Sequence, residues 1–142
     1  MWRNKSFLGA LFTGMGVVGM LDGIVFHQIL QWHSVIMETD RTGQIQSDGW
    51  FHLFVTALSF TGALLLRDGA AGDRPRLFWG GILMGAGIFN LVEGIVDHHL
   101  LQIHYVRLVT DHFAYDVSYD LFAALLILAG WTICRRARAY TD

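Results

Sequence analysis

The chain repeats one motif of ionisable residues within apolar sequence. Residues 22–33 read Asp-Gly-Ile-Val-Phe-His-Gln-Ile-Leu-Gln-Trp-His, and residues 93–104 read Glu-Gly-Ile-Val-Asp-His-His-Leu-Leu-Gln-Ile-His. When residues 9–35 are aligned with 80–106 at a constant offset of 71, 11 of the 27 columns are identical. Packing explains repeated leucines and valines, whereas buried acids and histidines cost free energy unless they are paired or ligated. The pattern predicts two tandem halves that each contribute to a polar site.

The composition is that of a membrane protein. Hydrophobic residues make up 54% of the chain and charged residues 15%, against about 25% charged in an average soluble domain. Four stretches are apolar enough to span a bilayer, namely about Phe7–Ile36, Trp50–Leu66, Leu77–His104 and Tyr119–Cys134. We therefore expect an all-α fold, an integral membrane four-helix bundle built from two tandem parallel helical-hairpin repeats. The single membrane domain covers 1–142, with repeat one at about 7–66, repeat two at about 77–134 and a linker at 67–76.

The basic residues predict the topology. Eight of the ten lysines and arginines precede the first span, lie between the second and third, or follow the fourth; only Arg41 and Arg107 lie on the other side. Because basic residues concentrate on the cytoplasmic side, both termini and the linker 67–76 should be cytoplasmic. The loops 37–49 and 105–118 should then be external, and every histidine should lie in the outer half of the membrane or beyond it.

The repeated polar residues form a candidate metal site. On continuous helices we expect a deeper layer and an upper layer nearer the outer surface. The deeper layer contains Asp22, His27, Glu93 and His98, with Gln31 and Gln102 as donors that orient the carboxylates. The upper layer contains His33, His52, His104 and Asp120. Mixed imidazole and carboxylate ligands suit Zn, Fe, Mn or Cu(II), but not Cu(I).

The remaining polar residues have simpler interpretations. Asp48 and Asp116 stand just ahead of apolar runs and are expected to be helix N-caps. His112 is expected to be a solvated loop residue, while Asp97 and His99 have no counterpart in the first repeat and face the headgroups or a substrate. Small residues spaced i, i+3, i+7 predict close packing between the first and third spans, namely Gly16, Gly19 and Gly23 in the first span and Gly87, Asn90 and Gly94 in the third.

Several functions fit these residues. The leading hypothesis is a metal-binding membrane protein, either a metalloenzyme or a metal-handling and assembly factor. The alternatives are a bis-His haem protein, a proton or ion pathway along the acid–histidine ladder, and a purely structural hydrogen-bond network. The single cysteine excludes an internal disulfide and a four-thiolate metal site. The expected surroundings are the lipid bilayer and no nucleic acid, and a homo-oligomer remains open.

The recurring motif Asp/Glu-Gly-Ile-Val-x-His-x-x-Leu-Gln-x-His resembles a bacterial family of predicted membrane proteins classed as domain of unknown function 2243. The likeness covers most of the chain and is specific at the two motifs. It implies a location in the bacterial inner (cytoplasmic) membrane and a membrane oxidase assembly partner. It implies no particular activity, so the chemistry depends on the residues themselves.

Overall fold

The computed structural model describes residues 1–69 and 75–138, and every element in this part of the chain is helical. The elements are α1 (Lys5–Asp22), the π-helical segment η1 (Gly23–Ile29), α2 (Arg41–Arg67), α3 (Pro75–Glu93), the π-helical segment η2 (Gly94–Leu100) and α4 (Phe113–Arg138). Four of the described stretches are long and apolar enough to cross a membrane: Lys5–Ile29, Arg41–Arg67, Pro75–Leu100 and Phe113–Arg136. The predicted all-helical membrane fold with four spans is therefore confirmed.

The first and third spans end earlier than their hydropathy predicts. The first ends at Ile29 and the third at Leu100, whereas their apolar sequence continues further. At both ends the backbone reverses through a glutamine with positive φ, Gln31 at 50° and Gln102 at 52°. A non-glycine residue rarely adopts this left-handed conformation. Its occurrence at both glutamines turns the chain back toward the helix that it has just left.

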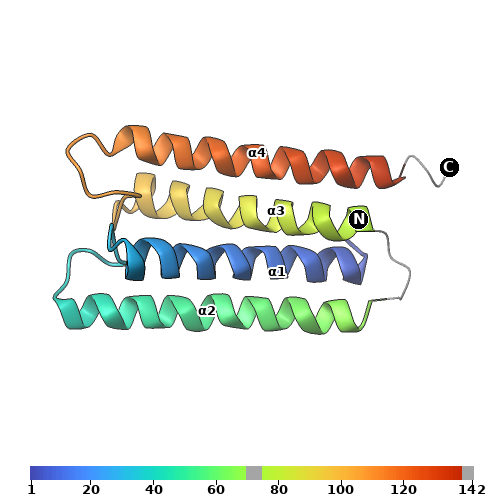
Figure 1. Ribbon diagram of the computed structural model, residues 1–142, viewed down its shortest axis with the longest axis horizontal. Helices are drawn as coiled ribbons and strands as arrows, with labels where there is room; N and C mark the ends of the chain where they lie inside the picture. The colour runs from blue at the N-terminus through green and yellow to red at the C-terminus, as the bar shows by residue number, and fades with distance from the viewer. Residues whose placement is uncertain (70–74, 139–142) are drawn as a thin grey trace.

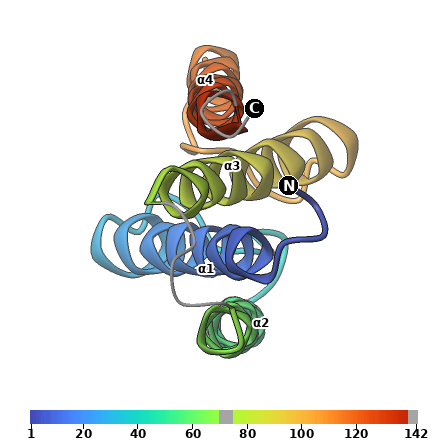
Figure 2. The same ribbon diagram turned by 90° about the vertical axis from the view of Figure 1, so that its right-hand side faces the viewer.

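The four long helices lie in a row in the order α2, α1, α3, α4 (Figures 1 and 2). α1 packs on α3 in the centre, α2 packs on α1, and α4 packs on α3. The predicted bundle is thus an open row, in which the described parts of α2 and α4 make no contact with each other. In the most apolar windows, 44% and 50% of residues are buried in the inner spans but only 11% and 17% in the outer spans. The outer helices therefore offer most of their apolar surface to lipid.

Glycines permit the close approach of the two inner helices. A Cβ atom added at Gly14 of α1 would overlap the Ile82 carbonyl of α3, and one added at Gly85 of α3 would overlap the Leu11 carbonyl of α1. Because neither position tolerates a side chain, the backbones of α1 and α3 can pack directly against each other, as small residues allow in membrane helices.

The motif glycines lie at a different contact from the one that their spacing predicted. Gly23 faces the ring of His52 on α2, and Gly94 faces the carboxylate of Asp120 on α4. The expectation that they mark the contact between the first and third spans is wrong. Counting spacing along a helix finds the small-residue stripe but does not identify which neighbour it faces.

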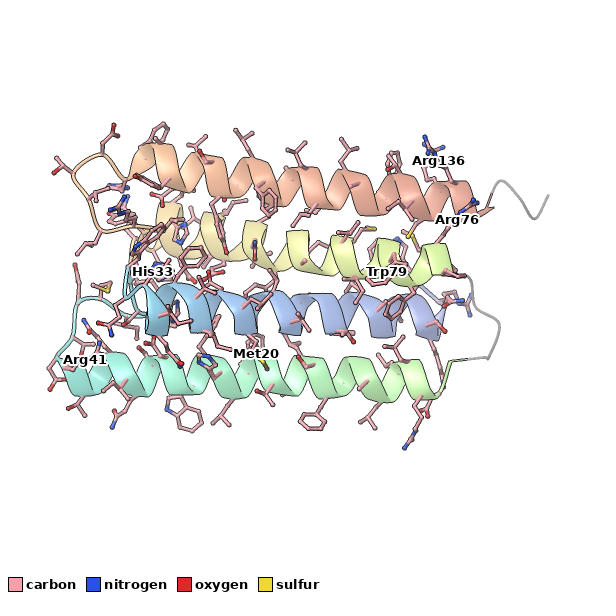
Figure 3. The ribbon with its side chains drawn as sticks, in the orientation of Figure 1. Met20, His33, Arg41, Arg76, Trp79 and Arg136 are labelled. Atoms are coloured by element: carbon pink, nitrogen blue, oxygen red, sulfur yellow. The ribbon has the colours of Figure 1, made fainter. Side chains whose placement is uncertain are left out.

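The side chains at the two ends of the helices differ in chemistry. His33 and Arg41 lie at one end, whereas Arg76, Trp79 and Arg136 lie at the other (Figure 3). α1 begins and α4 ends at this second end (Figure 1), an arrangement that accords with two termini on one side of a membrane. Which side that is stays a prediction. Of the expected linker 67–76, residues 70–74 lie outside the described residues, while its two ends belong to α2 and α3.

Candidate metal centre

The backbone reversals bring His33 and His104 together at the end of the molecule where His33 is labelled in Figure 3. The His33 and His104 rings stack with their centroids 4.6 Å apart and an interplanar angle of 8°. His33 Nδ1 lies 2.9 Å from the carbonyl oxygen of Val106, and His104 Nδ1 lies 3.0 Å from that of Val35. Since a carbonyl can only accept, each Nδ1 carries a proton, and in the neutral ring Nε2 keeps its lone pair. Each repeat thus fixes the tautomer of the other repeat's histidine.

His27 and His98 extend this pair into a compact cluster of four imidazoles. The His27 ring centroid lies 4.6 Å from that of His33, and the His98 centroid lies 4.9 Å from that of His104. Each of the four histidines is at most 4% exposed. The prediction of separate deeper and upper layers is therefore wrong for His33 and His104. It assumed continuous helices, whereas the loops fold these two histidines back beside the first pair.

On the first repeat's side, two carboxylates approach His27. Asp22 Oδ2 lies 3.3 Å from its Nε2, and Asp48 Oδ1 lies 3.1 Å from its Nδ1. Neither contact has the alignment of a hydrogen bond, and both ring nitrogens are buried without a hydrogen-bond partner. Asp22, His27 and His33 each offer a ligand atom, and these atoms lie within 4.8 Å of one another. The three residues could hold one metal ion.

The second repeat's side has a related but different group. Glu93, Asp97 and His104 offer ligand atoms within 4.8 Å of one another, so Asp97 joins this group in place of the expected His98. His98 remains next to it, with Nδ1 3.5 Å from Asp116 Oδ1. The phenol of Tyr119 donates a hydrogen bond of 2.8 Å to Glu93 Oε2, a contact that the motif did not reveal.

Asp48 and Asp116 anchor the histidine loops. Each accepts a backbone hydrogen bond of 2.9 Å across the hairpin, Asp48 from the N–H of Val35 and Asp116 from that of Val106. The prediction that they cap their helices is wrong. α2 begins at Arg41, seven residues before Asp48, where the side chain of Asp40 accepts from the Gly43 N–H, and α4 begins at Phe113, three residues before Asp116. Their alignment at matching positions of the two repeats was the sequence signal for this shared role.

Four of the expected polar residues have other places in the structure. His52 Nδ1 bonds to the carbonyl oxygen of Asp48 on its own helix at 2.8 Å, and Asp120 pairs with His99 at 2.8 Å. Neither belongs to the two groups that could hold a metal. Gln31 and Gln102 are exposed, so the expectation that they orient the carboxylates is wrong, and their place is in the backbone reversals.

The residues without repeat counterparts have specific partners. His112 is not a freely solvated residue, because its Nδ1 lies 2.8 Å from Asp116 Oδ2 and its ring stacks on Tyr105 at 3.7 Å. His99 belongs to the pair with Asp120 described above. The loop following each span therefore carries more of the network than the sequence indicated.

The two loop histidines differ in proton affinity. Burial lowers the pKa of His33 to about 2, and the neighbouring imidazoles of His104 and His27 add to this effect. Burial also opposes protonation of His104, but the Glu93 carboxylate and the Val35 carbonyl outweigh it, so that the pKa of His104 is raised. His33 is therefore a neutral imidazole with an available Nε2, as metal ligation requires.

The centre holds more unsatisfied polar atoms than a protein interior usually tolerates. Among the described residues, the buried side-chain atoms that lack a hydrogen-bond partner include Asp22 Oδ2, both ring nitrogens of His27, His33 Nε2, His98 Nδ1 and His104 Nε2. Lone pairs that converge in a buried site, with tautomers fixed by outer hydrogen bonds, are the arrangement found around protein-bound metals.

A family model described as a predicted membrane protein, DUF2243, matches residues 9–137. The chain belongs to this family. No curated protein and no solved structure matches the chain. The family description places the protein in a membrane, in agreement with the four apolar spans, and the chemistry of the centre rests on its geometry.

Proposed function

We propose that this protein binds a pair of transition-metal ions within the membrane, one on each side of the stacked His33–His104 pair. The supporting observation is that these two histidines hold their Nδ1 protons on backbone carbonyls while Nε2 is buried, unpartnered and close to carboxylates. Metal–nitrogen and metal–oxygen bonds are about 2.0–2.2 Å long. Ligand atoms up to 4.8 Å apart can therefore converge on one ion with small side-chain movements.

The donor set restricts the identity of the ions. Imidazole and carboxylate ligands favour Fe, Zn or Cu(II), since no thiolate lies in either group. Hydrogen bonds from outside the two groups keep the ligand atoms in place. Tyr119 donates to Glu93, and the anchoring carboxylates accept from the backbone of the histidine loops. Such a pair would serve either a metalloenzyme, to which the ions would supply Lewis-acid chemistry, or a metal-handling factor.

The same geometry disfavours the haem alternative. Axial histidines approach the iron from opposite faces of the porphyrin, whereas the His33 and His104 rings stack face to face with centroids 4.6 Å apart. That spacing leaves no room for a macrocycle between them. We therefore expect the absorption spectrum of the purified protein to lack a Soret band.

Metal content of the purified chain tests the proposal. We expect His33→Ala and His104→Ala each to lower the bound metal by about half, because each ion in a two-metal site has its own ligands, and the double variant to retain almost none. His99→Ala is the matched control, since it removes a histidine from the same end of the molecule but from neither ligand group. Wild-type metal content in the double variant, or a Soret band, would refute the proposal and leave the hydrogen-bond network as the better explanation.

A further inference from the structure

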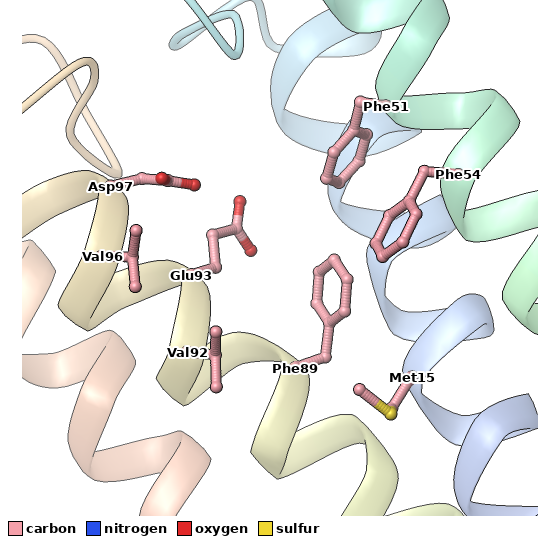
Figure 4. Close-up of a pocket in the computed structure, with 8 residues that line it drawn as sticks. All are labelled: Met15, Phe51, Phe54, Phe89, Val92, Glu93, Val96 and Asp97. Carbon is pink, nitrogen blue, oxygen red and sulfur yellow. The ribbon is translucent and has the colours of Figure 1, made fainter. Parts of the chain in front are cut away.

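A pocket on the membrane-facing side of the helices reaches Glu93 and Asp97, the two carboxylates of the second repeat's possible metal site. Its volume is about 260 Å³, and it lies between α1, α2 and α3. The rings of Phe51, Phe54 and Phe89 line one side, while Glu93 and Asp97 point their carboxylates toward these rings from the other (Figure 4). The pocket is thus an apolar chamber with two oxygen acceptors at one end.

The mouth of this pocket faces lipid. Phe54 is 58% exposed and Val92 is 56% exposed, and both lie on helices that span the apolar layer. Inside, the Phe51 and Phe89 rings meet edge to face at 6.0 Å. An occupant would therefore enter from the bilayer and would place its flat face against phenylalanine rings.

The first repeat provides a natural comparison. A pocket of about 310 Å³ lies at the equivalent position, where Leu21 replaces Val92, Asp22 replaces Glu93 and Phe26 replaces Asp97. Only the second-repeat pocket therefore offers two carboxylates. The two pockets have similar volumes and mostly apolar linings but different polar groups, since the first-repeat pocket has one carboxylate with Asn90 and Tyr119 whereas the second-repeat pocket has two carboxylates.

We propose that the second-repeat pocket binds a lipid-soluble quinol, with the aromatic ring among the phenylalanines and a hydroxyl donating to Glu93 or Asp97. The volume lies at the small end of ligand pockets and suits one substituted ring, while an isoprenoid or alkyl tail would pass the exposed Phe54 and Val92 into the bilayer. As the organic ligand of this pocket, a neutral hydroxyl donor fits better than an ammonium group, because the Glu93 carboxylate already accepts a hydrogen bond from Tyr119 and lies 3.8 Å from His104 Nε2.

The role of a bound quinol rests on the proposed function. Glu93 and Asp97 belong to one of the two possible metal sites, so they would hold the quinol hydroxyl beside the ion. Binding is measured on protein in detergent, both stripped of metal with a chelator and as purified. The probes are decyl-benzoquinol under anaerobic conditions, its dimethyl ether and decyltrimethylammonium. Affinity follows from the rise in Tm with ligand concentration, because a ligand that binds only the folded protein stabilises it.

The variants are Val92→Trp, which fills the mouth of the second-repeat pocket, and Leu21→Trp, its matched control in the other pocket. Both positions are more than half exposed, so both variants should fold. We expect the quinol to bind at least about tenfold more tightly than its dimethyl ether, the value of one hydrogen bond to a charged group. Val92→Trp should remove this binding, and Leu21→Trp should leave it within about twofold.

Three results would overturn the inference: equal binding of quinol and ether, tighter binding of the ammonium probe, or equal losses in the two tryptophan variants. Metal content, measured on the same preparations, keeps the two proposals apart. Metal without selective quinol binding removes this inference alone. Quinol binding in a chain that never retains metal removes the proposed function and leaves the pocket assignment standing.

Discussion

Replacing Asp116 by alanine should both destabilise the protein and abolish metal binding by Glu93, Asp97 and His104. The side chain is 1% exposed and accepts 2.9 Å and 2.8 Å hydrogen bonds from the Val106 N–H and His112 Nδ1. A hydrogen bond to a buried charge contributes about 1.5–3 kcal/mol. With the Val106 N–H left unpaired, we expect a loss of about 3 kcal/mol, or about 9 °C in Tm for a chain of this size.

Two further variants separate the anchoring role from ordinary helix capping. Asp116→Asn keeps an oxygen for the Val106 N–H and should lose less than half as much stability, but its metal affinity should fall about 10- to 100-fold, as when outer hydrogen-bond partners of ligands are removed. Asp40→Ala removes the true N-cap of α2 and should cost about 1 kcal/mol without changing bound metal. Thermal unfolding and elemental analysis of all three give the comparison. A loss for Asp116→Ala no larger than for Asp40→Ala, with metal unchanged, would refute the anchoring argument.

Two other predictions concern the framework. Gly14→Leu and Gly85→Leu should each separate α1 from α3 and lower the free energy of unfolding by at least about 1–3 kcal/mol, the usual range for overpacking. Gly49→Leu should be near neutral, because no atom lies within 4 Å of its added Cβ. Equal Tm values for the three variants would contradict the packing. A reporter that is active only in the periplasm should give no signal when fused after residue 142, because the basic residues predict a cytoplasmic C-terminus. A strong signal would reverse the orientation.

Hydropathy predicted the four helical spans, because membrane spans depend mainly on length and apolar content. The helix ends were missed, because apolar residues continue through Leu30 and Trp32, and residues 30–40 contain no proline or glycine to mark the break. The reversal depends on a glutamine in a left-handed conformation, which propensity does not indicate.

The candidate site was partly foreseen for the same reasons. Asp22 lies 3.3 Å from His27, two residues that counting along the first helix placed in one layer, whereas His33 and His104 join the cluster only because the chain turns back. Asp48 and Asp116 were mistaken for caps, since α2 extends beyond its apolar run into polar sequence, from Arg41 to Gly49. Contacts across a reversal cannot be read from spacing along one helix.

The crossed hydrogen bonds of His33 and His104 have an evolutionary consequence. Either hairpin alone would lack the carbonyl that orients its own histidine, so a chain of half this length would have to pair with a second copy to complete either end. Such a pair would be obliged to keep its two ends the same. Joining the copies in one gene removes that obligation, so that Phe26 and Asp97, or Phe51 and Tyr119, can diverge. One end can then be selected for a ligand while the other preserves the framework.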